Sequence, residues 1–118
     1  MVRIYRFCGV CPERSAAPAI AAVPYDVVTA DEARAIIRKN PRSFLRVSRP
    51  DAELSDIPAD DARIYERARE NFEALLKSGE MKRDATPAMY IYRVRQDGDE
   101  FLGLCSCLDV DDYRTTKI

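Results

Sequence analysis

The amino-acid sequence predicts an α+β (mixed α/β) domain with a small mixed or antiparallel sheet, two main helices and a C-terminal β-hairpin. Three local patterns carry this prediction. Thr29 and Glu32 have the spacing of a capping box ahead of an apolar stripe. A second, longer apolar stripe has helical periodicity and ends at Gly79. Near the end of the chain, an Asp97-Gly98 pair lies between two strand-like segments, as in a hairpin.

In the first half of the chain, residues 2–8 alternate loosely between apolar and polar side chains, which predicts a short strand. Residues 16–24 contain two prolines and are expected to be extended and irregular rather than helical. The capping box starts a helix over about residues 31–39, which Asn40-Pro41 ends. The apolar character of residues 44–47 predicts another strand.

In the second half, residues 51–61 are acidic and without periodicity, which predicts a surface loop. The strongest helix signal covers about residues 61–78, where Tyr65, Ala68, Phe72, Leu75 and Leu76 form one apolar stripe. Residues 88–95 and 100–110 are the two strands of the predicted hairpin.

Length and composition indicate one globular domain. The chain has 118 residues, of which 47% are hydrophobic and 33% charged, and its 19 basic and 20 acidic residues give a net charge of −1. Proteins that coat nucleic acid usually carry a basic excess, so nucleic acid is not an expected partner. The chain has no apolar run of membrane-spanning length, and its first residues lack the apolar region of a signal peptide. These features predict a cytoplasmic protein without a membrane partner.

The chain contains no histidine. This absence excludes catalytic triads built on histidine, HExxH metalloproteases and zinc fingers with histidine ligands from these 118 residues. A general base within the chain must therefore be a carboxylate, a lysine, a tyrosine or a cysteine.

Four cysteines form two close pairs, Cys8 with Cys11 and Cys105 with Cys107. Together they resemble the ligands of a four-thiolate zinc site, although the second pair has one intervening residue instead of two. Free cysteines are also among the most buried residue types. The sequence favours packing in the core over metal binding, and we assign no metal ligands.

Basic and acidic residues are segregated along the chain. Six bases without an intervening acid precede five acids without an intervening base: Arg34, Arg38, Lys39, Arg42, Arg46 and Arg49, then Asp51, Glu53, Asp56, Asp60 and Asp61. The charges at the two ends of the first helix complement its dipole, but those after residue 41 are not explained in this way. They form either an ordinary solvated surface or a site for a phosphate or carboxylate, which the planar guanidinium recognises with paired donors.

Two shorter motifs each have a functional and a structural interpretation. Pro24-Tyr25-Asp26 precedes the first helix and is either a rigid binding loop or a loop whose tyrosine packs and whose aspartate bonds within a turn. The acidic segment at residues 109–112 either offers carboxylates to a metal or is a solvated strand end.

Several of these motifs follow one another as in the bacterial and archaeal domain-of-unknown-function family numbered one thousand and fifteen, which the chain resembles over about residues 18–113. The residues that carry the resemblance are Pro24-Tyr25-Asp26-Val27-Val28, Asn40-Pro41-x-Ser43-Phe44-Leu45-x-Val47-x-Arg49-Pro50, Tyr90-x-Tyr92-Arg93 and Asp111-Asp112-Tyr113. Members of that family are often labelled putative regulators resembling the ParB/Spo-zero-J partition proteins. The wider ParB-like and sulfiredoxin-like superfamily includes nucleotide-binding domains and free serine kinases.

The resemblance implies a ParB/sulfiredoxin-like fold and a nucleotide- or small-anion-binding, kinase-like function, with ATP or another nucleotide and Mg²⁺ as the cofactor. Under this hypothesis the candidate catalytic residues are Asp26, Asp51 and Glu53. The candidate ligand-binding residues are Pro24, Tyr25, Ser43, Arg46 and Arg49. The chain has no Walker-type glycine-rich loop, so arginine side chains and helix N-termini are expected to hold the phosphates.

Two departures from the family pattern bear on these expectations. Asp51 stands where the family tends to have a glutamate after Arg-Pro. Family members usually continue through a glycine-containing turn into a Lys-His-Glu-x-Thr-like segment, before which this chain ends at Ile118. We therefore expect the 118 residues to be a single domain at the N-terminal end of a longer protein, with the following segment as a partner.

Two alternative functions remain open. One is a ParB-like DNA-associated regulator, although the sequence shows no helix-turn-helix and this part of the chain is expected to bind DNA poorly. The other is a non-catalytic interaction module, in which the charged runs are merely solvated and the exposed edge of the hairpin pairs with another chain.

Overall fold

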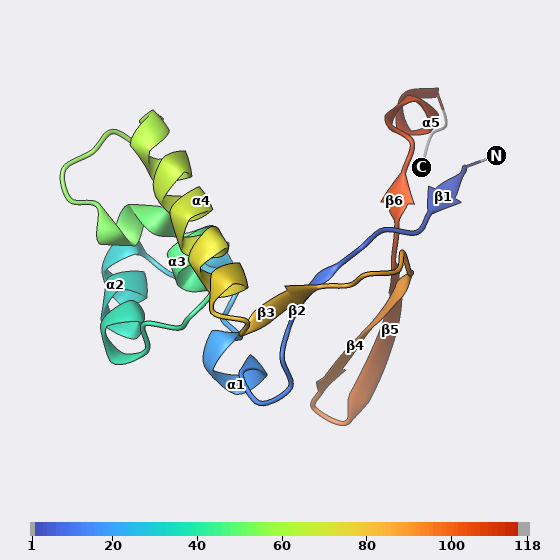
Figure 1. Ribbon diagram of the computed structural model, residues 1–118, viewed down its shortest axis with the longest axis horizontal. Helices are drawn as coiled ribbons and strands as arrows, with labels where there is room; N and C mark the ends of the chain where they lie inside the picture. Colours follow the sequence, from blue (N-terminus) through green and yellow to red (C-terminus); the bar gives the residue numbers. More distant parts are fainter. Residues whose placement is uncertain (1, 116–118) are drawn as a thin grey trace. The chain divides into compact units, whose positions relative to one another are not determined.

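The computed structural model describes residues 2–115, and these form two compact units. One unit consists of Cys11–Lys82 and is called here the helical unit; the other consists of Met1–Val10 with Arg83–Ile118 and is called the hairpin unit. Figure 1 labels the elements of both. The secondary structure is mixed α+β, as predicted, with small antiparallel sheets of two strands each.

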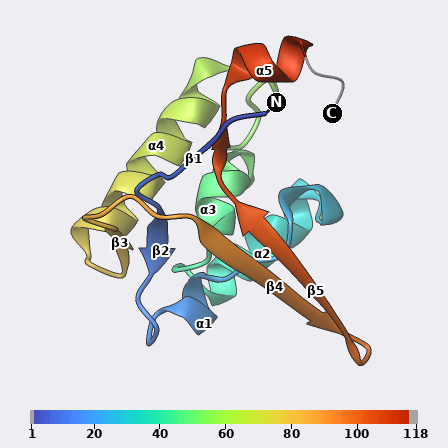
Figure 2. The ribbon, with the colours of Figure 1, turned by 90° about the vertical axis from the view of Figure 1, so that its right-hand side faces the viewer.

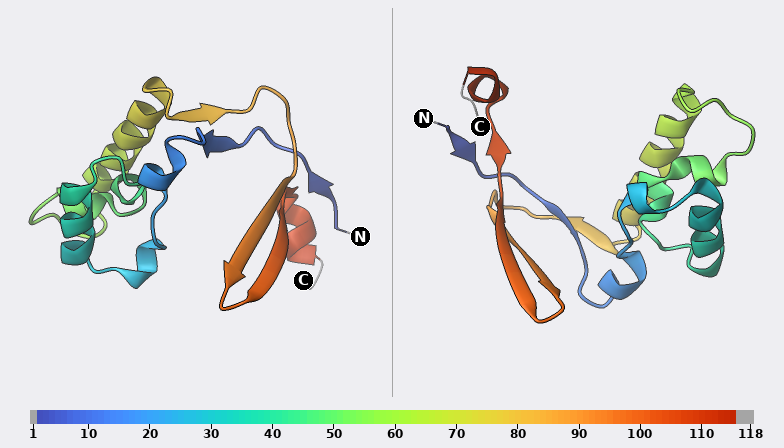
Figure 3. Two further views of the ribbon diagram at one scale, coloured as in Figure 1. Left: turned by 90° about the horizontal axis from the view of Figure 1, so that it is seen from below. Right: turned by 180° about the vertical axis from the view of Figure 1, so that it is seen from behind.

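The helical unit contains helices and two 3₁₀ turns. In chain order they are α1 (Ala17–Ile20), η1 (Tyr25–Val27), α2 (Ala30–Lys39), α3 (Leu45–Ser48), η2 (Pro50–Glu53) and α4 (Ala62–Lys77). Within this unit, α3 packs against α4, and both α2 and α3 contact η2 (Figures 1 and 3). Its buried core cluster consists of Ala33 and Ile37 from α2, Leu45 from α3 and Ala52 from η2.

Local signals define the ends of the two main helices. The Thr29 hydroxyl accepts a hydrogen bond from the Glu32 backbone N–H at 3.2 Å, and the Glu32 carboxylate accepts one from the Thr29 N–H at 2.8 Å. The predicted capping box is thus present at the start of α2. Asp61 caps α4 by accepting from the Arg63 N–H at 2.9 Å, and Gly79 follows the helix with φ +77°, a conformation that glycine adopts without steric cost.

Two expectations for the helical unit are wrong. Residues 44–47 were expected to form a strand, but Leu45–Ser48 form helix α3, in which Leu45 is buried in the core. Residues 16–24 were expected to be non-helical, but Ala17–Ile20 form the short helix α1. Pro18 lies in the first turn of α1, where the missing N–H has no helical partner to lose, so proline is tolerated there.

The hairpin unit is built on the antiparallel pair β4 (Tyr90–Gln96) and β5 (Asp99–Cys105). Figure 2 shows the two strands running side by side along their whole length. Asp97 and Gly98 connect them with φ values of 52° and 88°, the two positive values of a type I′ turn. The hairpin predicted from the Asp-Gly pair is confirmed.

The termini of the hairpin unit pair with each other. Strand β1 (Ile4–Tyr5) pairs antiparallel with β6 (Cys107–Leu108), and Phe7 forms an isolated bridge with Ala88. The first strand is therefore shorter than the predicted residues 2–8, and the predicted last strand divides into β5, β6 and the helix α5 (Val110–Thr115). A third sheet, β2 (Val10–Pro12) with β3 (Met81–Arg83), lies where the chain passes from one unit to the other.

Candidate functional site

Arg49 connects the Pro24-Tyr25-Asp26 loop to η2. Its Nε and Nη2 atoms donate to the two carboxylate oxygens of Asp51 at 3.0 and 2.8 Å. Its Nη1 donates to the backbone carbonyls of Tyr25 at 3.1 Å and of Val28 at 2.5 Å. The hydrogen bonds from Arg49 hold the pKa of Asp51 below its ordinary value and raise that of Arg49, so the pair is fully ionised at neutral pH.

These contacts define what Arg49 can do. A guanidinium has five N–H donors, and four of those of Arg49 are used inside the protein. The paired donors that would grip a phosphate face Asp51 instead. In this structure the Arg49–Asp51 pair therefore shapes the loop that carries Tyr25 and Asp26, and Arg49 retains one N–H donor for a ligand.

Arg46 and Glu53, two other predicted site residues, belong to a network that holds α4. Arg46 Nε donates to Glu53 Oε1 at 2.8 Å, and the buried amide of Asn71 donates from Nδ2 to Glu53 Oε2 at 2.6 Å. The same Nδ2 donates to the Arg46 carbonyl at 2.8 Å. Both oxygens of Glu53 thus have partners within the protein, so this carboxylate stabilises the packing of the helical unit.

The remaining predicted residues divide between the core and the surface. Ser43 is buried, and its hydroxyl accepts from the Leu45 N–H at 3.3 Å at the start of α3. Pro24 precedes η1, and Tyr25 and Asp26 within η1 are exposed. Within residues 2–115, the Asp26 side chain has no hydrogen bond or ion pair. Asp26 is therefore a carboxylate available to a ligand.

Tyr25, Asp26, Arg49 and Asp51 line a cavity of about 550 Å³, to which α4 contributes the exposed side chain of Tyr65. We call it the tyrosine pocket. Tyr65 was expected to belong to the buried stripe of its helix, but 70% of its surface is exposed. Tyr65 lies in the first turn of α4, in which Asn71 is the buried residue.

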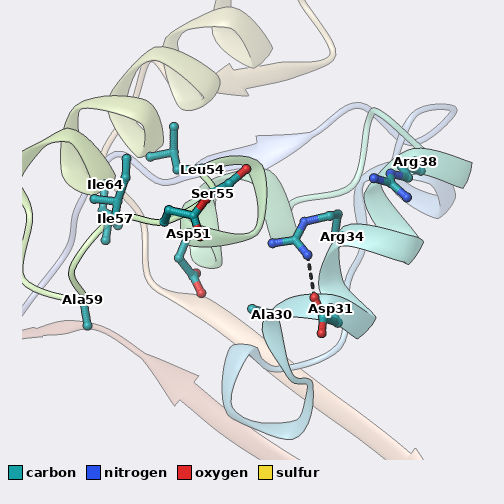
Figure 4. Close-up of a pocket in the computed structure, with 11 residues that line it drawn as sticks. Ala30, Asp31, Arg34, Arg38, Asp51, Leu54, Ser55, Ile57, Ala59 and Ile64 are labelled. Atoms are coloured by element: carbon teal, nitrogen blue, oxygen red, sulfur yellow. Dashed lines mark hydrogen bonds and ion pairs between the residues drawn. The ribbon is translucent and has the colours of Figure 1, made fainter.

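A second cavity of about 580 Å³ adjoins the tyrosine pocket and shares Asp51, Ala59 and Ile64 with it. We call it the arginine pocket because α2 contributes Arg34 and Arg38 to its lining. Figure 4 shows its residues: the guanidinium of Arg34 and the carboxylate of Asp51 are turned toward the same space, and Arg38 lies one turn further along α2. The tyrosine pocket thus contributes aromatic groups, and the adjoining arginine pocket contributes two arginines together with three aspartates, Asp31, Asp51 and Asp56.

The two arginines of this pocket differ in their partners. Arg34 donates from Nη1 to Asp31 Oδ1 at 2.5 Å and from Nε to the Ala52 carbonyl at 2.9 Å. The side chain of Arg38 has no hydrogen bond or ion pair with any described residue. From the sequence, Arg38 was expected to complement the helix dipole. Its position in the lining of this pocket depends on how residues 51–64 pack opposite α2.

The cysteines and the acidic segment at residues 109–112 form no metal site in the structure. Among the described residues, no group of three or more cysteines, aspartates or glutamates is placed to hold a metal ion. Cys11, Cys105 and Cys107 are exposed and Cys8 is half-buried, so the expectation of core packing is wrong for three of the four. Asp112 instead accepts from Arg3 Nε at 3.1 Å, and this hydrogen bond lowers the pKa of Asp112.

Comparisons with known proteins identify a family but no characterised relative. The family model described as "Protein of unknown function (DUF1015)" matches residues 4–118. No curated protein and no solved structure matches the chain. None of the helices in the described part of the chain combines the length and apolar character that crossing a membrane requires.

Proposed function

The chain belongs to the family of proteins of unknown function DUF1015, and we propose that its helical unit binds a nucleotide across the tyrosine and arginine pockets. The observation that carries this proposal is the junction of the two cavities: a cavity lined by two tyrosines meets a cavity lined by two arginines and three aspartates, and the two share Asp51, Ala59 and Ile64. A nucleotide has the same division, with a flat base at one end and an anionic phosphate group at the other.

In this proposal the base stacks on the tyrosines. Tyr25 and Tyr65 are exposed by 61% and 70%, and both line the tyrosine pocket. Stacking of a base on an aromatic ring contributes about 1–3 kcal/mol, and it tolerates different bases because every base has a π face. Asp26 lies in the same lining and accepts hydrogen bonds from an amino group of the base or a hydroxyl of the ribose.

The phosphates occupy the arginine pocket. Arg38 brings an unpaired guanidinium to this cavity, so binding a phosphate breaks no existing ion pair. Mg²⁺ arrives with the phosphates, because this ion commonly keeps several waters and uses one or two carboxylates rather than an all-protein cage. Three carboxylates line this cavity: Asp31 pairs with Arg34 and Asp51 with Arg49, whereas the Asp56 side chain has no hydrogen bond or ion pair within residues 2–115.

A kinase-like reaction is the further step of the proposal. Phosphoryl transfer needs positioning and charge stabilisation more than covalent chemistry from the protein. Of the three predicted catalytic carboxylates, Asp51 and Glu53 already have internal partners on both oxygens. Asp26 lines the cavity that holds the base, so we assign it to positioning the base and ribose rather than to accepting the proton of the attacking hydroxyl. Arg49 acts as a positioning residue, since it holds the loop that carries Asp26.

Calorimetric titration with adenosine, ADP and ATP in the presence of Mg²⁺ tests the proposal. Tyr65→Ala is expected to weaken the binding of all three compounds by about tenfold or more, because all three carry the base. Arg38→Ala is expected to weaken ADP and ATP and to leave adenosine unchanged, because only the phosphates meet this side chain.

Two matched controls accompany these variants. Arg14→Ala removes another exposed arginine of the helical unit, which has no partner within the described residues and does not line either cavity. Tyr113→Ala removes a tyrosine of similar exposure, 66%, from the hairpin unit. Both controls should bind as the wild type does. Absence of binding to any of the three compounds, or equal losses in controls and pocket variants, would refute the nucleotide site.

A further inference from the structure

The hairpin of β4 and β5 exposes large apolar side chains on both of its faces. Residues directly opposite each other in an antiparallel pair share a face, so the register assigns Ile91, Leu102 and Leu104 to one face and Tyr92 and Phe101 to the other. Each of these five side chains is between 58% and 78% exposed. The first face also carries Arg93, Arg95 and Glu100, so exposed apolar side chains lie on both faces of the hairpin and are mixed with charges on one of them.

A hairpin of two strands is at best marginally stable in water without further strands or a packed layer. Large exposed apolar patches on a folded protein commonly mark surfaces of interaction. Within residues 2–115, β4 and β5 pair only with each other, so each strand has one free edge. The hairpin therefore has both the apolar surface and the backbone edges needed to extend its sheet.

The two free edges differ in protection. Natural edge strands avoid pairing with other chains through charged residues, prolines, bulges or short length. β4 carries Arg93 and Arg95. β5 is seven residues long, pairs without a bulge and has neither lysine nor proline, and its charged residues are Asp99 and Glu100 at the turn end. The β5 edge is thus the less protected one.

The turn determines which backbone groups lie on the β5 edge. Gln96 and Asp99 close the two-residue turn, and hydrogen-bonded and non-hydrogen-bonded pairs alternate from there. This alternation directs the N–H and C=O groups of Phe101 and Gly103 toward β4. Those of Glu100, Leu102 and Leu104 face away from β4 and are available to another strand.

We propose that β5 pairs antiparallel with β5 of a second copy of this chain, about a two-fold axis at Leu102, to form a four-stranded sheet. In this register Leu102 faces Leu102 of the partner subunit as a hydrogen-bonded pair, and Glu100 faces Leu104 of the partner subunit. Phe101 faces Gly103 of the partner subunit at a non-hydrogen-bonded position, where the side chains are closest. An aromatic ring then covers a strand glycine, a pairing that stabilises sheets.

The charges of β5 are compatible with this pairing. Glu100 accepts from Arg95 Nε at 2.6 Å within its own hairpin, and Arg93 lies 4.0 Å from the same carboxylate. Glu100 is the one charged residue in the segment 100–105. Self-pairing therefore brings no unpaired charge to the centre of the new sheet, where Phe101, Leu102 and Leu104 meet.

Sedimentation of the 118-residue chain at several concentrations, combined with hydrogen–deuterium exchange, tests the proposal. The wild type is expected to be dimeric at high concentration, with amide protection of Leu102 and Leu104 that increases with the dimer fraction. Leu102→Lys places two like charges opposite each other at the two-fold axis and should raise the dimer dissociation constant by about tenfold or more. Val110→Lys is the matched control, because Val110 is exposed by 65%, nearly the same as Leu102, but lies outside the hairpin.

Each outcome decides the proposal. Loss of the dimer and of the protection at Leu102 and Leu104 in Leu102→Lys, but not in Val110→Lys, supports it. A chain that stays monomeric at all concentrations overturns it and leaves the hairpin to another partner, such as a following segment of a longer protein. A dimer that survives Leu102→Lys, or in which the amides of Leu102 and Leu104 exchange freely, also overturns it. Circular dichroism of each variant verifies that the fold is retained.

Discussion

The hydroxyl of Tyr90 accepts a hydrogen bond from the backbone N–H of Gly9 at 2.7 Å and occupies the space that a side chain at position 9 would need. A Cβ atom on Gly9 would lie 2.6 Å from Tyr90 Cζ, well inside van der Waals contact. The same hydroxyl donates to Asp84 Oδ2 at 2.5 Å, and the Tyr90 ring packs on Phe7 with a centroid distance of 5.0 Å. Tyr90 thus joins the base of the hairpin to the N-terminal segment of its unit.

Gly9→Ala is expected to destabilise the hairpin unit by about 1–3 kcal/mol, the usual cost of overpacking a filled site. The substitution forces the Tyr90 ring away from both Gly9 and Asp84. Thermal unfolding followed by the near-ultraviolet signal of tyrosine measures the effect. Gly103→Ala, measured at a concentration at which the chain is monomeric, is the comparison, because the nearest atom to its Cβ is a backbone oxygen at 3.9 Å. Equal stability of Gly9→Ala and the wild type would contradict the tight contact.

Arg49→Ala should lower the free energy of unfolding of the helical unit by about 1–3 kcal/mol, since it leaves the Asp51 carboxylate and two backbone carbonyls without their partner. Arg49→Lys should recover little of this loss, because a lysine cannot make the two parallel bonds to Asp51. Urea denaturation of both variants checks this expectation. If Arg49→Ala folds as stably as the wild type and loses only ligand binding, Arg49 contacts the ligand directly.

Leu45→Ala is expected to cost about 2–5 kcal/mol, because only 1% of the Leu45 surface is exposed and the surrounding core contains small alanines that cannot fill the space. The measurement is the midpoint of urea unfolding with the slope held constant. Ile36→Ala serves as the control, because Ile36 is a residue of similar size in α2 of the same unit but is exposed. A change in Leu45→Ala no larger than in Ile36→Ala would argue against α3 as a core element.

The N-terminus of α4 should lose stability in acid. Hydrogen bonds from Arg63, first from its side chain and then from its backbone, lower the pKa of Asp61 to about 2 from an ordinary value of 3.8. Because the folded-state pKa is the lower one, the ionised carboxylate stabilises the fold above 3.8, and this contribution is lost as the pH falls from there toward about 2.

Asp61→Asn removes the negative charge but keeps a side chain that caps the helix, since asparagine is an equally good N-cap residue. The variant should show a smaller decrease in the free energy of unfolding over this acid range, measured by urea denaturation at a series of pH values. Asp60→Asn is the neighbouring control, because the Asp60 side chain has no hydrogen bond or ion pair among the residues that the structure describes. An unchanged pH dependence in Asp61→Asn would show that the Arg63 contact does not form in solution.

The elements that could be predicted from the sequence are those whose signals are local. The capping box at Thr29 and Glu32, the long stripe of α4 and the Asp97-Gly98 turn each lie within one element, and each is confirmed. Residues 44–47 were wrongly expected to form a strand because a run of four residues is too short to show a period. Burial of Leu45 against α2 and η2 decides its helical conformation, and that packing involves distant parts of the chain.

The side-chain contacts of the candidate site could likewise not be predicted from the sequence. The charge pattern predicted Arg49 and Asp51 as site residues, but the internal hydrogen bonds of Arg49 depend on the carbonyls of Tyr25 and Val28, more than 20 residues away. The exposure of Tyr65 and the free guanidinium of Arg38 likewise depend on how residues 51–64 pass between α2 and α4. Sequence spacing alone contains no information on these contacts.

We expect the buried amide of Asn71 to couple the unfolding of α3 to that of η2. One Nδ2 atom donates both to α3, at the Arg46 carbonyl, and to η2, at the Glu53 carboxylate. If either segment detached alone, a buried polar group would lose its partner, which costs free energy without any gain in apolar hydration. Detachment of α3 without η2, or of η2 without α3, is therefore a high-energy state. We expect the backbone amides of both segments to exchange with solvent in one common opening event rather than in two.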